Sequence, residues 1–287
     1  MNAPVSVDLA SLRRRLWLYR ALSLFLTAFV LCVLLALRSA MAVPEDPDVE
    51  VFDVPARFEA LSQKNPDAAD VSETYFYADG ATVHMHVMGR GQTCPLHIHR
   101  KTHEATIIVA GQAEVHQVWG QEEGLAERRG THDPGELIAS GPFTGHAWFN
   151  RATDRMLGNL VFASPRFDGN LYVEVDDARM RQGAAPFVYV PPPALDVLQA
   201  AGEPVHEVSL PVLSDRMAAV NLGAGEYGVE GTRAAPVLVY VTQGEGGLSA
   251  GEERPMKPGQ LWVLRRKASV RAREGHPLSF YVFRPGA

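Results

Sequence analysis

Between residues 91 and 104 the chain reads Gly91-Gln92-Thr93-Cys94-Pro95-Leu96-His97-Ile98-His99-Arg100-Lys101-Thr102-His103-Glu104. His97 and His99 are two residues apart, so on a β-strand both side chains point to the same face. Glu104 follows five residues later, which is far enough for a turn to bring it back on the next strand. The stretch therefore predicts a strand–turn–strand unit that gathers two imidazoles and one carboxylate.

A fourth candidate ligand, His146, lies beyond a long polar loop at residues 120–135 and would come from a further strand. The chain has ten histidines, and eight of them fall between His84 and His146, a density that scattered surface residues would not produce. Three imidazoles and one carboxylate suit a divalent ion such as Fe, Mn, Ni, Cu or Zn. Such a set leaves coordination positions open for water or a substrate.

The composition is that of a globular protein rich in strands. The chain has 287 residues, enough for two ordinary domains. Many of its 25 glycines and 20 prolines separate short apolar runs, a pattern typical of all-β sandwiches and barrels. The formal net charge is -6 and no basic tract occurs beyond the N-terminus, so nucleic-acid binding is not expected. The two cysteines, Cys32 and Cys94, give no disulfide framework.

The N-terminal segment, residues 1–42, has the pattern of a membrane anchor or an export signal. Arginines precede an uncharged apolar run at residues 21–37, and acidic residues follow it. This distribution orients a single membrane helix with its C-terminal side exported. A retained anchor fits, and so does a signal peptide cleaved after Ala42, because Ala40-Met41-Ala42 is a small-x-small site. The length of the run favours the anchor. Either alternative places the rest of the chain outside the cytoplasm, tethered in the periplasm or secreted.

Four segments follow the N-terminal one. Residues 43–72 are rich in Pro, Asp and Glu and indicate a linker with at most one short helix at residues 56–63. Short strands with glycine turns fill residues 73–185, and a Pro-Pro-Pro run indicates a stiff spacer at residues 186–204. The strands of residues 205–287 echo the first series, since Pro258-Gly259-Gln260-Leu261 matches Pro134-Gly135-Glu136-Leu137. We therefore expect two copies of one barrel.

The spacing around the histidines resembles the first motif of the cupin superfamily, which is Gly, five residues, His-x-His, three or four residues, Glu, six residues, Gly. Five residues fit this motif without a gap: Gly91, His97, His99, Glu104 and Gly111. The family's second motif is kept in part, because His146 and Asn150 have the His-x3-Asn spacing whereas the preceding Pro-to-Gly spacing differs. The resemblance covers about residues 73–163. It implies an all-β fold of two cupin-type (jelly-roll) β-barrels preceded by one N-terminal transmembrane or signal helix.

In the second copy the ligand positions hold other residues. Aligning Gly244 with Gly111 places Val237 where Glu104 stands and Thr232 where His99 stands. We therefore expect a single metal site, in the first barrel. The second barrel would be structural and would cover edges of the first barrel or supply the surface of a homodimer.

The resemblance implies a metal-dependent protein with a small-molecule substrate or ligand, and Fe or Mn is then favoured over Zn, Ni or Cu. The N-terminal segment adds the expectation that this protein is extracytoplasmic. The family includes dioxygenases, decarboxylases, isomerases and oxidases. A dioxygenase-like oxidoreductase is the first hypothesis, with Glu104 as a catalytic base. A non-catalytic cupin that binds or senses a metal or small molecule is the second, so enzyme activity stays open. A purely structural zinc site ranks third, because such sites usually have four protein ligands and often contain cysteine.

Strand parity predicts the walls of the pocket. Residues that share the parity of Glu104 or His146 would face the same cavity, with plain core packing as the equal alternative: Thr106, Ile108, Trp148 and Asn150. His84 and His86 share one face of their own strand, and we expect at least one of them to face solvent. His103 adjoins Glu104 and points the other way, so it is not expected to bind the metal.

Overall fold

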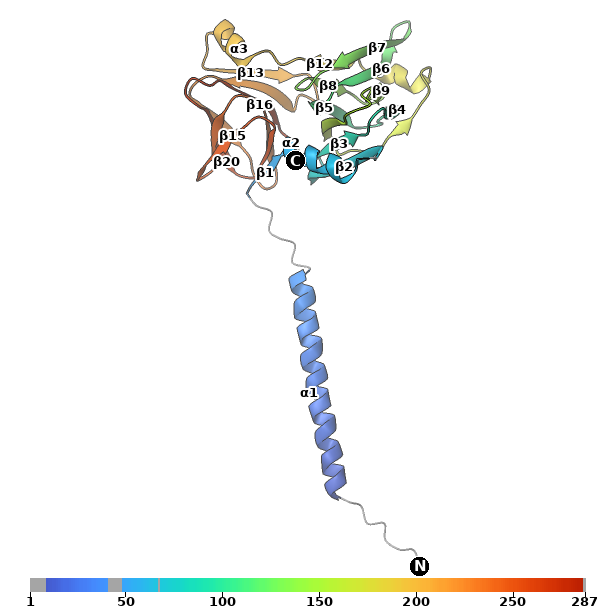
Figure 1. The fold of residues 1–287 in the computed structure, drawn as a ribbon, viewed down its shortest axis with the longest axis vertical. Coiled ribbons are helices and arrows are strands. Elements are labelled where there is room, and N and C mark those ends of the chain that lie inside the picture. Colours follow the sequence, from blue (N-terminus) through green and yellow to red (C-terminus); the bar gives the residue numbers. More distant parts are fainter. Residues whose placement is uncertain (1–8, 41–47, 67, 286–287) are drawn as a thin grey trace, which may run out of the picture. The chain divides into compact units, whose positions relative to one another are not determined.

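The computed structural model describes residues 9–40, 48–66 and 68–285 and divides the chain into two compact units, Met1–Asp46 and Pro47–Ala287. The first unit contributes one long helix, α1 (Leu9–Ala40) (Figure 1). Large apolar side chains such as Trp17, Phe25 and Phe29 are exposed along this helix.

The sequence predicted a transmembrane or signal helix at this position. A helix is present, but no helix in the part of the chain that the structure describes is long and apolar enough to cross a membrane. The prediction of a transmembrane helix is therefore not supported. The expected cleavage site after Ala42 lies outside the described residues.

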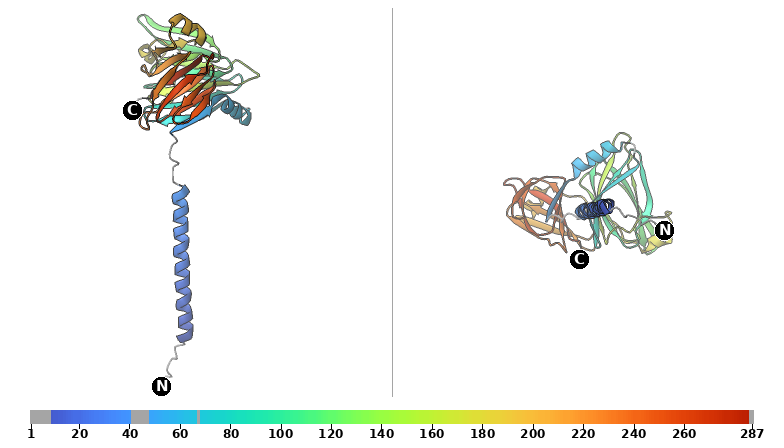
Figure 2. Two further views of the ribbon diagram at one scale, coloured as in Figure 1. Left: turned by 90° about the vertical axis from the view of Figure 1, so that its left-hand side faces the viewer. Right: turned by 90° about the horizontal axis from the view of Figure 1, so that it is seen from below.

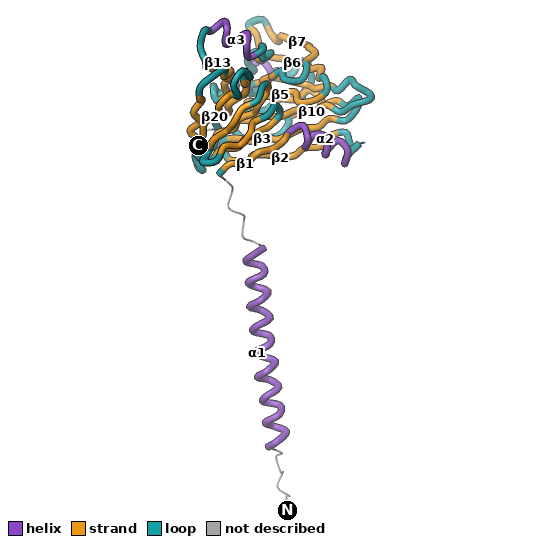
Figure 3. Tube along the Cα trace, turned by 60° about the vertical axis from the view of Figure 1, so that its left-hand side comes forward, coloured by secondary structure: helices purple, strands orange, loops and turns teal. Residues whose placement is uncertain are grey.

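The second unit consists mostly of strands, which confirms the predicted β class (Figure 3). The N-terminal half of this unit forms two antiparallel sheets. The six-stranded sheet has the order β12-β8-β5-β10-β3-β2 and contains β2 (Asp70–Ala78), β3 (Ala81–Met88), β5 (His103–Ala110), β8 (Leu137–Ser140), β10 (Leu157–Ser164) and β12 (Phe187–Tyr189). The five-stranded sheet has the order β11-β4-β9-β6-β7 and contains β4 (Thr93–Ile98), β6 (Ala113–Gln121), β7 (Gly124–His132), β9 (Gly145–Phe149) and β11 (Leu171–Tyr172).

The C-terminal half repeats this arrangement with two further sheets. The six-stranded sheet has the order β1-β19-β16-β21-β14-β13 and contains β1 (Val49–Asp53), β13 (Val205–Leu210), β14 (Met217–Leu222), β16 (Val237–Gln243), β19 (Gln260–Leu264) and β21 (Leu278–Phe283). The four-stranded sheet has the order β15-β20-β17-β18 and contains β15 (Glu226–Glu230), β17 (Gly246–Ser249), β18 (Glu253–Met256) and β20 (Lys267–Ala272). Figure 2 shows the strands of each half curling into a separate lobe.

The two segments expected as linkers contain short elements of regular structure, and the helix expected at residues 56–63 is one of them. The first contains β1 and the helix α2 (Val54–Lys64), whose N-terminus is capped by the Asp53 side chain. The proline-rich segment contains β12 and the helix α3 (Ala194–Ala201), and a short 3-10 helix, η1 (Ala178–Gln182), precedes it. Composition predicted spacers here because a strand of three to five residues leaves little periodic signal.

Strand β1 crosses from one half of the chain to the other. It pairs with β19, so that Val51 lies opposite Trp262, about two hundred residues away in the sequence. An ion pair between Glu50 and Arg265 reinforces this pairing. The chain before the first lobe is therefore part of the sheet of the second lobe.

The two six-stranded sheets pack against each other. Their shared core contains Met85, Ile107 and Phe162 from one sheet and Tyr281 and Phe283 from the other. The rings of Phe162 and Phe283 meet edge to face with their centroids 5.5 Å apart. Strands of the first sheet are thus covered on both faces, one toward the neighbouring sheet and the other toward the interior of their own lobe.

The interior of the second lobe is filled with apolar side chains. Its core includes Val237, Val239, Leu248, Trp262 and Phe280. Val237, which aligns with Glu104, is one of these packed residues. Among the residues that the structure describes, the single group of metal-ligating side chains lies in the first lobe.

The second glycine of the cupin-like motif has a structural reason. Gly111 ends the turn after β5 with φ of 79°, a left-handed conformation that favours glycine. A Cβ atom there would lie 2.9 Å from the backbone oxygen of Met156. Both the backbone angle and the close approach therefore require glycine at this position.

Candidate metal centre

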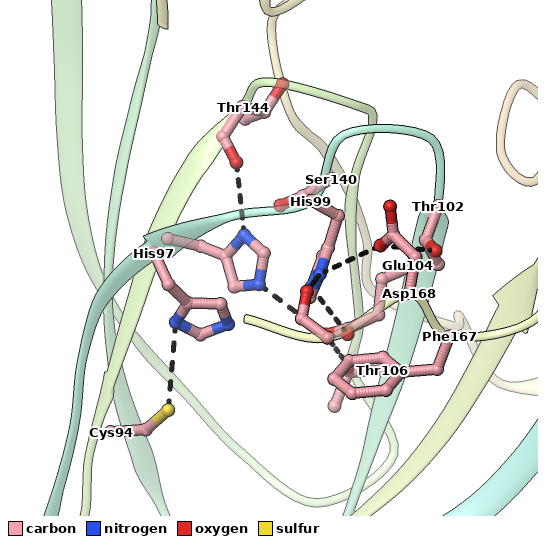
Figure 4. A network of polar contacts seen from close by, with 12 residues as sticks. Cys94, His97, His99, Thr102, Glu104, Thr106, Ser140, Thr144, Phe167 and Asp168 are labelled. Carbon is pink, nitrogen blue, oxygen red and sulfur yellow. Dashed lines mark hydrogen bonds and ion pairs between the residues drawn. The ribbon is translucent and has the colours of Figure 1, made fainter. Parts of the chain in front are cut away.

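Three histidines of the five-stranded sheet and its edge meet inside the first lobe. Figure 4 labels two of them, His97 and His99. His97 lies on β4, His99 follows the last residue of that strand, and His146 lies on β9 directly opposite His97. Their candidate ligand atoms all lie within 4.8 Å of one another, and all three residues are buried. The register of two neighbouring strands thus produces a cluster that the spacing of His97 and His99 alone could only suggest.

Each histidine is oriented by a backbone carbonyl. The Nδ1–H groups of His97, His99 and His146 donate to the carbonyl oxygens of Pro95 at 2.8 Å, Gly169 at 2.9 Å and Thr144 at 3.2 Å, respectively. A carbonyl oxygen only accepts, so these contacts assign the proton of each neutral ring to Nδ1 and leave the Nε2 lone pair free. Metal-binding histidines are commonly held in this way.

The Nε2 atoms of His99 and His146 are buried without a hydrogen-bond partner. Buried polar atoms normally have hydrogen-bond partners. Two buried nitrogens without a partner in one cluster therefore indicate that a binding partner is missing. A divalent cation fits this position because it accepts lone pairs from several imidazoles at once. The described residues therefore fit a metal ion held by His97, His99 and His146.

Glu104 approaches the cluster from the opposite sheet. Its carboxylate oxygens lie 3.3 Å from Nε2 of His99 and 3.7 Å from Nε2 of His146, and one of them accepts a hydrogen bond from Thr106 at 3.2 Å. A carboxylate facing two nitrogen lone pairs is stable only with positive charge between them, either a proton or a metal ion. The structure thus places Glu104 beside the triad, where it can share the ion's charge.

The pKa values follow from the burial of this cluster. Burial, together with the charge of neighbouring histidines, lowers the pKa of His146 to about 3. Burial also lowers the pKa of His97. Burial acts to raise the pKa of Glu104, but the surrounding histidines outweigh it and lower that pKa. His97 and His146 are therefore neutral and Glu104 is anionic at neutral pH, as metal binding requires.

His99 carries the proton that competes with the metal. Burial acts to lower its pKa, but the Glu104 carboxylate beside it raises the pKa overall. Below this raised pKa, metal binding must displace a proton, so the apparent metal affinity should fall by about tenfold for each unit that the pH drops. Titration of the protein with Co²⁺ below about pH 6.5, the ordinary pKa of histidine, measures this slope. A constant affinity over that range would show that no proton leaves His99.

Cys94 also lies near the cluster, with its sulfur 3.7 Å from Nδ1 of His97. Burial raises the pKa of its thiol to about 12. The thiol is therefore protonated at neutral pH and is a poor metal ligand, because the thiolate is the form that binds. Its place is beside His97, on the wall of the cavity.

A cavity of about 230 Å³ opens beside the cluster and is bordered by His97 and Glu104. Of the four residues predicted to line a pocket, Thr106 and Trp148 border this cavity. Ile108 does not, since it packs in an apolar cluster with Met88 and Leu157. Its parity is that of Glu104, but at this level of the sheet the cavity is bordered by its partner on β10, Asn159.

Asn150, which was also predicted to line the pocket, does not border this cavity. Its side-chain amide donates to the carbonyl oxygens of Gly89 at 2.9 Å and Arg155 at 3.0 Å, and its Oδ1 accepts from the backbone N–H of Ala152. The residue follows the end of β9 and connects loops instead of continuing the strand. The His-x3-Asn spacing from His146 thus places a residue that connects loops by hydrogen bonds, not a pocket residue.

Replacing Asn150 by leucine should destabilise the fold. The substitution removes the Asn150 donor from the carbonyl of Arg155 and one of the two donors from the carbonyl of Gly89, which also accepts from the backbone N–H of Gln92. Each lost hydrogen bond costs about 0.5–1.5 kcal/mol. Chemical denaturation of the variant measures the change in the free energy of unfolding. An unchanged denaturation midpoint would contradict a structural role for the Asn150 side chain.

His84 and His86 face the cavity, not solvent. Burial lowers the pKa of His84, whereas His86 forms an ion pair with Asp70 at 2.7 Å. Both residues are half-buried and line the interior of the lobe, because the other face of β3 packs on the neighbouring six-stranded sheet. His103 borders a different cavity, together with Phe143 and Leu213.

Sequence reasoning missed the segment that covers the cluster, residues 166–172. Phe167 from this segment packs edge to face on His99 with ring centroids 5.1 Å apart, and Tyr172 packs on His97 at 6.0 Å. Asp168 anchors the segment by accepting hydrogen bonds from the hydroxyl of Thr102 at 2.9 Å and the backbone N–H of Lys101 at 3.1 Å. No local pattern marks this segment; its role arises from pairing of β11 with β4.

No protein-family model matches the sequence, and no curated protein matches it. Solved structures do resemble the fold. A cupin 2 conserved barrel domain protein from Leptotrichia buccalis has a TM-score of 0.58 at 12% identity, with 85% of this chain and 100% of that chain covered. Salicylate 1,2-dioxygenase from Pseudaminobacter salicylatoxidans has a TM-score of 0.57 at 12% identity, with 86% and 87% covered. Adducts of that dioxygenase with gentisate have also been crystallised, and they match with a TM-score of 0.58 at 14% identity, with 99% and 92% covered.

These similarities extend over both lobes and agree with the motif spacing around the histidines. At such low identity they establish the architecture and leave the reaction open. The fold of this chain is therefore the cupin fold, with a buried histidine triad in its first lobe.

Proposed function

We propose that the protein is a metal-dependent cupin enzyme, an oxidoreductase of the dioxygenase type that acts on a small organic molecule. One divalent ion would be held by His97, His99 and His146, with Glu104 beside it. The observation that carries this proposal is the convergence of Nε2 atoms, two of them buried without a partner, while every Nδ1 is bonded to a backbone carbonyl.

Three protein ligands leave room for more, which separates this site from a structural zinc site with four closed ligands. A bound iron or manganese ion would supply Lewis-acid and redox chemistry at these open positions. The cavity at the cluster gives a small molecule access to that position, and aromatic side chains form part of its wall. The salicylate 1,2-dioxygenase structures add support through their shared fold.

Glu104 is the candidate catalytic base. Its carboxylate is anionic, borders the cavity and lies within 4 Å of two histidines. It can take a proton from a substrate hydroxyl that enters the cavity, while Thr106 holds one carboxylate oxygen in place. The hydrogen bonds from Nδ1 keep the rings of the triad fixed during this transfer.

Metal analysis and oxygen uptake test the proposal. We expect about one iron or manganese ion per chain in protein purified from its own compartment, and oxygen consumption with single-ring phenols or enediols. Salicylate and gentisate are the first compounds to try, because the dioxygenase of similar fold is named for one and binds the other. A stoichiometric zinc ion and no oxygen uptake with any of these compounds would contradict an oxidoreductase.

A non-catalytic cupin that binds or senses a small molecule is the second candidate. The observation that favours it is the partial cover of the cluster by Phe167 and Tyr172, which would retain a ligand as well as a substrate. Binding without turnover in the experiment above is its expected result.

We also infer that the second unit works outside the cytoplasm. The support is the sequence alone, with arginines before the apolar run of residues 21–37 and acidic residues after it. Alkaline phosphatase fused after Ala287 should be active in cells, since that reporter needs export. An inactive fusion of normal abundance would contradict the inference.

A further inference from the structure

The wall of the cavity away from the triad is polar. It is formed by the inner face of the six-stranded sheet, where three side chains from neighbouring strands stand in one row. His86 on β3 lies opposite Ser72 on β2 and opposite Asn159 on β10. All three residues border the cavity that also touches His97 and Glu104. The row thus faces whatever molecule occupies the cavity.

Asn159 is the member of this row that lacks a partner. Its side chain is 2% exposed, and its Oδ1 is buried without a hydrogen bond. A buried carbonyl oxygen that has lost its hydrogen bonds to water and has no donor in the protein destabilises the fold, so such oxygens are rare in folded proteins. Asn150, in the same lobe, shows the usual outcome, since both its amide nitrogen and its oxygen are bonded to backbone groups. The free oxygen of Asn159 therefore indicates a hydrogen-bond donor on the ligand.

His86 is held rigid beside Asn159. Its Nε2 lies 2.7 Å from a carboxylate oxygen of Asp70. Because a carboxylate only accepts, Nε2 must carry a proton, and the ring is fixed in one orientation. This pair fixes the His86 ring at the wall of the cavity.

The size and lining of the cavity limit the ligand. The volume of about 230 Å³ lies below the roughly 300–1,000 Å³ typical of pockets for drug-sized ligands, which favours a single ring. Trp148, Phe167 and Tyr172 supply aromatic walls. A flat ring packs favourably on such walls.

The polar row and the triad lie at different ends of this space. Asn159 pairs with Ile108, and Ile108 is four residues from Glu104 on β5, a backbone separation of about 13 Å. A ligand that contacts both ends of the cavity must therefore carry polar groups at its two ends.

We propose that Asn159 recognises a ring hydroxyl, so that the ligand is a single-ring hydroxyaromatic compound whose hydroxyl donates to Oδ1 of Asn159 while its other polar group faces the triad. This inference rests on the proposed function for the metal end of the ligand only. Asn159 is the residue that sets specificity, and Asp70 acts through His86 as a positioning residue.

Salicylate and gentisate are suitable probes because they differ by one ring hydroxyl. Binding of each to the full chain, loaded with metal and kept free of oxygen, is measured by calorimetry. The unmodified protein should bind gentisate about tenfold more tightly than salicylate, which is the usual value of one hydrogen bond. Asn159→Leu should remove this preference, and Asn159→Asp, which still offers an acceptor, should keep it.

Metal content and thermal unfolding of each variant show whether the site and the fold are intact. Asn65→Leu, the same substitution outside the cavity, serves as the matched control and should keep the tenfold preference. A preference that survives Asn159→Leu overturns the inference, and so does a loss of preference in both Asn159 variants with normal metal content. Failure of the unmodified protein to bind either probe also overturns it.

The outcomes separate this inference from the proposed function. Selective binding of gentisate without oxygen uptake would support Asn159 as the specificity residue and refute the oxidoreductase. Oxygen uptake with other compounds, without binding of these probes, would refute Asn159 as the specificity residue and support the oxidoreductase. Absence of bound metal would refute the metal centre whatever the probes do.

Discussion

Replacing His99 by alanine is expected to remove the bound metal. His99 supplies one of three converging imidazoles, and its Nε2 has no hydrogen bond but faces the Glu104 carboxylate at 3.3 Å. Loss of a group that merely orients a metal ligand costs about 10–100-fold in affinity, so loss of the ligand itself should cost more. Elemental analysis after dialysis measures this directly. Thermal unfolding gives a second readout, because added metal should no longer raise the midpoint.

His103→Ala is the matched control for this prediction. His103 lies four residues further along the chain and borders a different cavity. Its replacement should leave about one ion per chain. If the His99 variant retained metal as well as the His103 variant does, the assignment of the triad would be wrong.

Replacing Phe162 by alanine should cause the largest loss of stability of any single change considered. Phe162 is 1% exposed and packs on Phe283, so it joins the two six-stranded sheets. Removal of a buried phenylalanine ring typically costs about 3–5 kcal/mol, from lost burial and the cavity that remains. Urea denaturation of the variant measures this as a lower midpoint at an unchanged slope.

The exposed residue Leu195 on α3 provides the comparison. Leu195→Ala should change the free energy of unfolding by no more than about 0.5 kcal/mol. A loss below about 1 kcal/mol for Phe162→Ala would contradict a rigid core shared by the two halves of the unit.

The sequence predicted that the residues at the centre of the cluster lie together, because their signal is local. His97, His99 and Glu104 lie within eight residues, and strand periodicity alone places the two histidines on one face. The position of His146 opposite His97 required the register of β4 and β9, which the spacing could suggest but not prove. The class of the fold followed in the same way from short apolar runs and glycine turns.

The errors share a physical cause, which is pairing between segments far apart in the sequence. The alternation of β3 suggested a strand with one solvent-exposed face. In the structure Met85 packs on the second lobe and His86 faces the cavity. Both faces are covered, and a pattern of period two cannot tell a cavity from solvent. The strand β1 was missed because its partner β19 lies at the other end of the chain.

The remaining misassignments concern where a strand ends. Asn150 keeps the parity of His146, but β9 ends at Phe149, so the side chain turns into a loop clamp. The covering segment with Phe167 and Gly169 has no regular pattern, although Gly169 orients His99 through its carbonyl. Hydrogen bonds of this kind depend on tertiary structure and leave no periodic trace in the sequence.

The most direct test of the metal centre is anomalous diffraction from crystals of the metal-loaded protein, recorded on both sides of the absorption edge of the metal found by elemental analysis. We expect one strong anomalous peak among the Nε2 atoms of His97, His99 and His146, at about 2.0–2.2 Å from each nitrogen. A peak elsewhere in the chain, or none in crystals of protein that contains the metal, would contradict a metal centre on these three histidines.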